Sequence, residues 1–184
     1  MYVNNILTSG RPEHEVSAAE NSIYDFLEKA GVNFARAEHE EAATIELCLT
    51  VEKILGAHIC KNLLLCNRTA TDFYLLIMPG SKPFKTKYLS AQIGSSRLSF
   101  ADSSYMEGFL NTKPGSLSVL GLLFDKEKRV RLLIDKDIRA YEYLGFHPCK
   151  NTATLRFSTT DLFDKIIPAL GHEPTEVELK TDES

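Results

Sequence analysis

Three short stretches of the sequence carry polar side chains of the kinds that act on substrates. Lys61 opens the apolar run KNLLLC, where an ammonium group can hold a phosphate or carboxylate at the lip of a pocket. Residues 114–118, PGSLS, combine a glycine with two hydroxyls, and backbone N–H groups in such a turn can bind an oxyanion or a ligand carbonyl. Residues 145–152, GFHPCKNT, contain a histidine and an asparagine that can orient a substrate. Each stretch also has a plain structural interpretation: a solvent-facing lysine, a turn and a tight surface loop.

A thiol nucleophile is the weaker interpretation of the third stretch. Cys149 follows His147 by two residues, but closeness in sequence does not supply base-to-thiol geometry, and no acidic third member is evident. The four cysteines form no CxxC pair and no zinc spacing with the histidines, which favours free thiols in a reducing compartment. The sequence contains no HExxH, P-loop or GxGxxG motif, and we expect neither a metal nor a cofactor.

Composition and charge bound the class of protein. The chain has 184 residues, 43% hydrophobic and 25% charged, which is typical of one globular domain with a real core. No apolar run approaches the roughly 18 residues of a membrane span, and the first residues do not resemble a secretory signal, so we expect a cytoplasmic protein. The net charge is −6 over residues 1–60, +6 over 61–150 and −4 over 151–184. The basic middle is either a solvated surface or a patch that docks phosphates.

The elements that must position these side chains follow from hydrophobic spacing and turn signals. Two apolar runs, 62–66 and 73–78, flank the polar turn NRTAT and predict a β-hairpin buried on both faces. The order of hairpins and helices predicts a mixed α/β domain with largely antiparallel pairing. The other expected helices cover 16–30, which Gly31 closes, Thr44 to about Gly56, 81–93, 104–110 and a segment that begins at Thr160. The other expected strands cover 33–37, 95–100 and 152–157, and a second hairpin pairs 119–124 with 130–134.

Four segments, in order, resemble the YbaK/prolyl-tRNA synthetase editing-domain superfamily. They are KNLLL at 61–65, SRLSFA at 96–101, PGSLS at 114–118 and GFHPCKNTATLRFSTTDL at 145–162. Glu38-His39 followed by Thr44 also resembles the region ahead of the family's first pocket helix. The match runs from about residue 20 to 170 and is most similar to the free-standing trans-editing branch, ProX/PrdX. It implies a single mixed α/β domain over residues 1–172, with a barrel-like core flanked by helices, and an acidic C-terminal tail over 173–184.

The resemblance also implies an activity, which is hydrolysis of the ester of mischarged Ala-tRNA(Pro). In this family a water molecule attacks the aminoacyl carbonyl without a metal, and the terminal ribose hydroxyl assists. Prolyl-tRNA synthetase activates alanine because a proline pocket cannot firmly exclude a smaller amino acid. A second site that admits alanine and rejects proline corrects the error. The implied partners are mischarged tRNA(Pro) and prolyl-tRNA synthetase, with no DNA and no membrane.

The resemblance assigns roles residue by residue. Lys61 matches the family's key lysine, which holds the tRNA terminus, and His147 matches the histidine that shapes the small pocket around the alanyl methyl group. The implied substrate-binding residues are Asn62 beside the lysine, Gly115 and Ser116 in the loop that faces the aminoacyl group, and Asn151, which braces its own loop.

One position departs from the family pattern. The family loop often reads GxxxP, and the fifth position here is Val119, which leaves pocket rigidity and amino-acid preference open. Alanine is the expected aminoacyl group, and cysteine or another small residue is the alternative. A second hypothesis is a non-catalytic relative that binds an aminoacyl-tRNA or an amino acid as a regulator. The presence of both Lys61 and His147 favours the enzyme.

Overall fold

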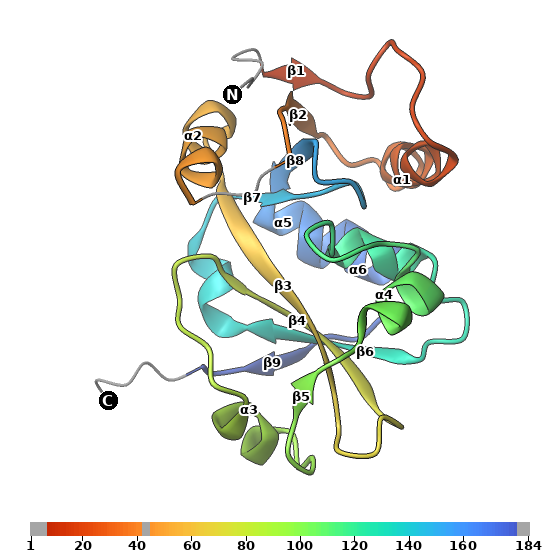
Figure 1. Ribbon diagram of the computed structural model, residues 1–184. Coiled ribbons are helices and arrows are strands. Elements are labelled where there is room, and N and C mark those ends of the chain that lie inside the picture. Colours follow the sequence, from red (N-terminus) through yellow and green to blue (C-terminus); the bar gives the residue numbers. More distant parts are fainter. Residues whose placement is uncertain (1–6, 42–44, 180–184) are drawn as a thin grey trace.

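A computed structural model of the chain describes residues 7–41 and 45–179 (Figure 1). Within these ranges, one mixed sheet of nine strands carries the fold. In spatial order its strands are β1 (Thr8–Ser9), β2 (Ala35–Glu38), β8 (Ala153–Ser158), β7 (Tyr143–Phe146), β3 (His58–Cys66), β4 (Phe73–Pro79), β6 (Val130–Asp135) and β9 (Thr175–Val177), while β5 (Ser99–Phe100) pairs with β3. The helices are α1 (Ala18–Lys29), α2 (Ile45–Leu55), α3 (Thr86–Gln92), α4 (Ser103–Leu110), α5 (Thr159–Asp161) and α6 (Ile167–Leu170), with a π-helical turn at Leu162–Ile166 and 3-10 turns at Val119–Leu123 and Lys136–Ala140.

The predicted mixed α/β class is confirmed, and the sheet runs in both directions. Among the described strands, β3 with β7, β4 with β6, and β6 with β9 are parallel, and the other five pairings are antiparallel. The first predicted hairpin is confirmed as β3 and β4, paired from Cys60 opposite Pro79 to Cys66 opposite Phe73. Parallel pairs need long crossovers, so hairpin signals in the sequence could not reveal them.

The predicted second hairpin is wrong. Val119–Leu123 forms a 3-10 turn, in which the Ser118 hydroxyl accepts a hydrogen bond from the Leu120 N–H group at 3.2 Å. Strand β6 pairs with β4 instead, in parallel. Val119 and Leu120 are completely buried, and a short buried apolar run fits a strand and a helical turn equally well. The PGSLS loop therefore leads into a helical turn, not a strand.

The other predicted elements are present with shifted bounds. Helix α1 begins at Ala18 because Ser17 and Glu20 form a capping box, and Gly31 ends it at a φ of 68°. Helix α3 and strand β5 are shorter than the predicted ranges. Thr44, the predicted cap of α2, lies outside the described residues.

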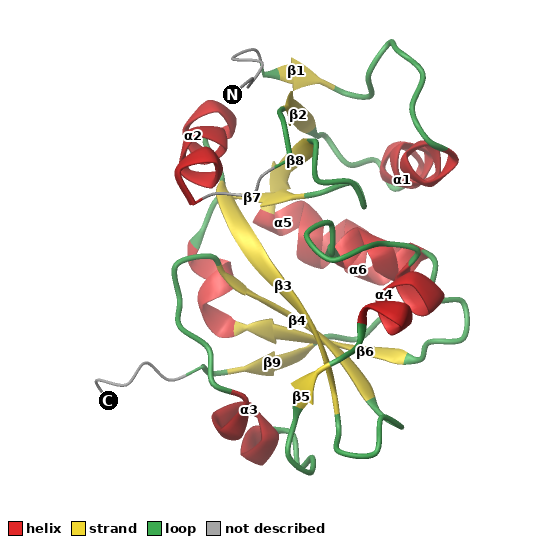
Figure 2. Cartoon of the chain, in the orientation of Figure 1, coloured by secondary structure: helices red, strands yellow, loops and turns green. Residues whose placement is uncertain are grey.

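The sheet separates two hydrophobic clusters, because neighbouring side chains of a strand point to opposite faces. On β3, Leu64 contributes to the larger cluster, which also takes residues from α1, α4 and α6. Leu65 contributes to a smaller cluster that includes Leu89 of α3. Figure 2 shows α3 well apart from α1, α4 and α6. By the same alternation, Lys61 belongs to the α3 face of β3 and Asn62 to the opposite face.

The end of the described chain packs onto this sheet. Strand β9 lies within the segment that the sequence presents as an acidic tail, and it pairs with β6. Val177 and Leu179 are buried in the smaller cluster. No helix among the described residues is long and apolar enough to cross a membrane.

Candidate active site

The candidate site lies beside the middle of β3, where that strand has a neighbour on one edge only. Strand β4 pairs along the whole of 60–66, whereas on the other edge β7 pairs at 58–59 and β5 at 65–66. No described strand pairs with residues 60–64 on that second edge. Lys61 and Asn62 therefore lie in the one stretch of β3 that leaves room for loops and for a ligand.

Lys61 is exposed and its ammonium group is oriented by a backbone carbonyl. Its Nζ atom donates a hydrogen bond to the carbonyl oxygen of Lys82 at 3.0 Å. Lys82 is itself fixed, because its Nζ atom lies 2.8 Å from the buried carboxylate of Asp135 and 2.7 Å from Asp137. Burial alone would lower the pKa of Lys82, but the hydrogen bonds to the two aspartates outweigh it and raise the pKa. An ion cluster, buried at Asp135 and exposed at Asp137, thus holds the loop that positions Lys61.

Asn62 binds the PGSLS loop to β3. Its Oδ1 atom accepts a hydrogen bond from the Val119 N–H group at 3.1 Å, and its Nδ2 atom donates to the Cys60 carbonyl at 3.1 Å. Proline at position 119 would have no N–H group to donate. The valine that departs from the family pattern therefore provides a tether that the usual proline cannot make.

The loop itself is a tight turn beside Asn151. Gly115 has a φ of +85°, in the left-handed region that favours glycine, and a Cβ atom there would lie 3.7 Å from the Asn151 Nδ2 atom. The N–H group of Ser116 closes the turn by donating to the Lys113 carbonyl at 3.0 Å, and the Ser116 side chain is buried. The backbone N–H of Ser116 is thus engaged in the turn and is not an oxyanion donor in this conformation.

His147 is held as a neutral imidazole with a defined tautomer. Its Nδ1 atom lies 2.8 Å from the Ala153 carbonyl oxygen, and a carbonyl only accepts, so Nδ1 carries the proton. Burial lowers the pKa of His147 below its usual value, which keeps the ring neutral at pH 7. Both hydrogen bonds described for His147 use Nδ1, so Nε2 is left as an acceptor.

A second histidine supports the first through a shared threonine. The Nδ1 atom of His39 donates to the Glu40 carbonyl at 2.6 Å, so its Nε2 atom must accept the hydrogen bond from the Thr154 hydroxyl at 2.8 Å. Thr154 is fully buried, and its oxygen lies 3.4 Å from Nδ1 of His147. Burial lowers the pKa of His39 as well. The sequence placed His39 only near a pocket helix, and its pairing with Thr154 becomes visible only once β2 is placed beside β8.

Cys149 does not have the character of a nucleophile. Burial raises the pKa of its thiol to about 12, so the thiolate is scarce at neutral pH. Among the described residues, no group of three or more His, Cys, Asp or Glu side chains is arranged to hold a metal ion.

The predicted residues thus come together in two groups. The first group is the loop at 114–119, which contains Gly115 and Ser116 and has Asn62 and Asn151 beside it. His147 lies in the same connection between β7 and β8 as Asn151. Lys61 lies on the other face of β3, and no hydrogen bond between described residues joins it to His147. A substrate that touches both must therefore reach across the middle of β3.

Comparisons with known proteins identify the family of the chain. The aminoacyl-tRNA editing domain family matches residues 39–165. The chain is 29% identical over 161 residues to the prolyl-tRNA editing protein ProX of Acetoanaerobium sticklandii, which covers 88% of this chain and 98% of that protein. It is 31% identical over 142 residues to prolyl-tRNA synthetase associated domain-containing protein 1 of Mus musculus, which covers 74% of this chain and 82% of the mouse protein.

Solved structures show the same fold. A crystal structure of a candidate trans-editing enzyme for prolyl tRNA synthetase superposes with a TM-score of 0.67 at 16% identity, over 91% of this chain and 99% of the other. At that identity the likeness concerns the fold alone, whereas the family match rests on the sequence of residues 39–165. The chain belongs to the aminoacyl-tRNA editing domain family, and it is an aminoacyl-tRNA deacylase.

Proposed function

We propose that this deacylase acts in trans on mischarged Ala-tRNA(Pro), without a metal or a cofactor, in the cytoplasm where aminoacyl-tRNAs form. The observation that carries the proposal is the fixed state of His147, a partly buried neutral ring whose Nδ1–H group donates to a carbonyl and whose Nε2 atom is an acceptor. A neutral acceptor suits the α-ammonium group of an aminoacyl ester, which a charged imidazolium would repel. The similarity to a prolyl-tRNA editing protein and to a prolyl-tRNA synthetase associated domain-containing protein supports the choice of tRNA.

In the proposed reaction, a water molecule attacks the ester carbonyl of the alanyl group. The bond between the carbonyl carbon and the ribose oxygen breaks, and the oxygen of water becomes part of the alanine carboxylate. The neighbouring ribose hydroxyl relays a proton from the water to the leaving ribose oxygen. The protein contributes mainly positioning and charge stabilisation, which are large terms in such reactions.

Five of the candidate site residues have a part in this reaction. Nε2 of His147 accepts a hydrogen bond from the α-ammonium group and directs the methyl group into a small pocket. Lys61 holds the terminal phosphate or ribose of the tRNA. Asn62 and Gly115 keep the loop at 114–119 rigid, and Asn151 supports it, so that a ring as large as that of proline does not fit.

The test is deacylation of four substrates in the presence of a chelator: Ala-tRNA(Pro), Cys-tRNA(Pro), Pro-tRNA(Pro) and Ala-tRNA(Ala). We expect rapid loss of alanine from tRNA(Pro) alone, unchanged by the chelator. Faster hydrolysis of Cys-tRNA(Pro) would replace alanine by cysteine as the substrate. Binding of tRNA without hydrolysis of any ester would identify a non-catalytic relative. Adding prolyl-tRNA synthetase tests whether that enzyme delivers the substrate.

A further inference from the structure

A second cleft, away from the loop at 114–119, combines aromatic rings with positive charge. It lies between α3, the segment before it and β5, and has a volume of about 760 Å³. Its lining residues are Phe84, Lys85, Thr86, Lys87, Ser90, Arg97 and Phe100. They include three cations and no acidic residue, so the cleft is electropositive in a protein of net charge −4.

Phe100 gives the cleft an exposed aromatic surface. Its side chain is 62% exposed, and it is one of three large exposed hydrophobics among the described residues. Strand pairing with Leu65 of β3 fixes its backbone, and the ring meets Phe84 edge to face with centroids 6.3 Å apart. An exposed phenylalanine on a rigid strand is not needed for the core, and it is a suitable platform for a flat ligand.

Two cations of the cleft, Lys87 and Arg97, differ from the cations elsewhere on this face. Lys82 and Lys136 both form ion pairs with carboxylates. Arg97 is exposed and forms no ion pair with any residue in the described ranges, and Lys87 contacts the ring of Tyr88 instead of a carboxylate. Groups of this kind bind phosphates by displacing counterions.

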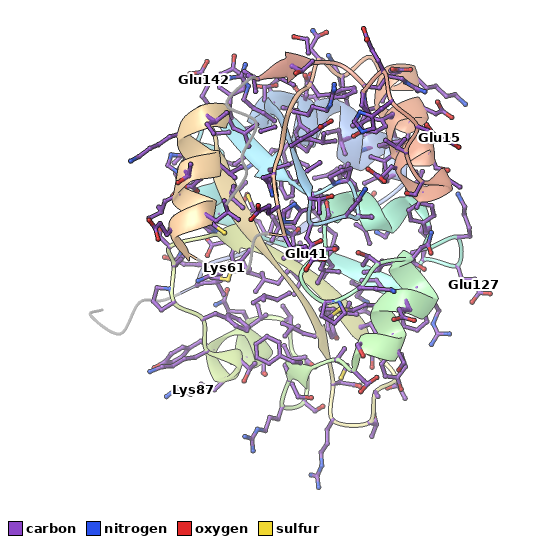
Figure 3. The ribbon with its side chains drawn as sticks, turned by 45° about the horizontal axis from the view of Figure 1, so that its top comes forward. Glu15, Glu41, Lys61, Lys87, Glu127 and Glu142 are labelled. Atoms are coloured by element: carbon purple, nitrogen blue, oxygen red, sulfur yellow. The ribbon has the colours of Figure 1, made fainter. Side chains whose placement is uncertain are left out.

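The cleft and Lys61 lie on the same side of the sheet and are connected by the loop from Lys82 to Phe84, because Leu65 between them is buried. Lys61 and Leu65 lie on the same face of β3, four residues or about 13 Å apart, and Phe100 is level with Leu65. The loop that holds Lys61 through the Lys82 carbonyl reaches the cleft two residues later, at Phe84. Figure 3 labels Lys61 and Lys87 in the same view, with Lys87 below Lys61. Stacked nucleotides advance about 3.4 Å each, so about 13 Å corresponds to about four of them.

We propose that this cleft binds the unpaired 3′ strand of the tRNA acceptor end. A base stacks on Phe100 beside Phe84, and Lys87 and Arg97 neutralise phosphates. The strand then passes over the loop from Phe84 to Lys82 and places its terminal nucleotide at Lys61. This inference rests on the proposed function for the identity of the RNA. The site itself is defined by stacking and phosphate chemistry and is testable without catalysis.

Binding of a short, fluorescently labelled single-stranded RNA that ends in CCA tests the site directly. We expect Phe100→Ala to weaken binding at least about fivefold, the effect of losing one base–aromatic stack, and Phe100→Trp to restore it. Arg97→Ala should weaken binding and reduce the slope of log K against log salt by about 0.7. The matched controls are Leu49→Ala, another exposed apolar side chain, and Lys126→Ala, another exposed cation, and neither should change binding.

Two results would overturn the inference. One is equal binding of the RNA by the wild-type protein and by Phe100→Ala. The other is equal binding of a blunt RNA duplex or of polyglutamate, which would identify a general anion surface. Deacylation measured in parallel separates the two proposals. Loss of RNA binding in Phe100→Ala with no hydrolysis by the wild type supports the cleft and rejects the proposed function. Hydrolysis with an unchanged KM in both cleft variants rejects the cleft and keeps the function.

Discussion

Replacing Lys82 by methionine tests whether the ion cluster positions the loop that holds Lys61. Lys82 is 10% exposed at its side chain and Asp135 is 0% exposed, so Lys82→Met leaves a carboxylate in the interior without its cation. Breaking a buried pair in this way costs about 3–5 kcal/mol. Asp135 keeps one hydrogen bond, from the Asp137 N–H group at 2.9 Å, which favours the lower end of that range. For a chain of this size, about 3 kcal/mol lowers Tm by about 6–12 °C.

The assay is urea unfolding of Lys82→Met, with Lys136→Met as the matched control. Lys136 also pairs with a carboxylate, that of Glu178, but both side chains are about half exposed, and such a pair contributes at most about 1 kcal/mol. Removing both charges, in Lys82→Met with Asp135→Asn, should recover part of the loss because no uncompensated charge then remains. Deacylation by Lys82→Met should show a higher KM, because the backbone carbonyl of residue 82, which accepts the hydrogen bond from Lys61, is no longer held in place. If Lys82→Met loses no more unfolding free energy than Lys136→Met, the reasoning is refuted.

Three further predictions concern the two catalytic candidates and pH. Lys61→Ala should abolish deacylation and change the free energy of unfolding by less than about 0.5 kcal/mol, because the side chain is exposed; full activity would reject the assignment. His147→Ala should enlarge the pocket and admit bulkier aminoacyl groups, and unchanged selectivity across a series of aminoacyl-tRNAs would contradict that role. Burial lowers the pKa of His39 and of His147 in the folded protein. As pH falls, these histidines therefore take up protons in the unfolded chain first. The stability that they contribute is complete above about pH 6.5 and declines below it. Urea unfolding from pH 7.5 to 5.5 should show this decline, and it should be shallower in His39→Gln.

Local signals predicted the parts of the fold that depend on neighbours in sequence. The hairpin of β3 and β4 follows from two apolar runs around a polar turn, and α1 follows from helical spacing ended by Gly31. The strand predicted over 119–124 is wrong because a short apolar run that is mostly buried has no period of its own. The parallel pairs of β3 with β7 and of β4 with β6 join distant segments, and nothing local in the sequence encodes such partners.

For the candidate site, too, local sequence signals and contacts between distant residues have to be distinguished. The motifs predict which side chains belong to it, and this stays a prediction, but they could not indicate what fixes those side chains. The carbonyl that orients Lys61 comes from Lys82, 21 residues away, and the hydroxyl that links the two histidines comes from Thr154, 115 residues from His39. These contacts depend on the completed sheet, so they appear only in the structure.

Position 119 shows how a departure from a family motif can conserve its physical effect. Proline stiffens a loop by fixing φ and by removing backbone freedom from the unfolded chain. Valine fixes φ less firmly but regains an N–H group, which donates to Asn62 across 57 residues of sequence and ties the loop to β3. If this tether replaces the proline, Asn62→Ala should leave the buried Val119 N–H without a partner and cost about 1–3 kcal/mol of stability. It should also relax the exclusion of proline, so that Pro-tRNA(Pro) is hydrolysed measurably. An Asn62→Ala enzyme with unchanged stability and unchanged selectivity would show that the loop draws its rigidity from the buried turn that begins at Val119, and that the tether contributes little.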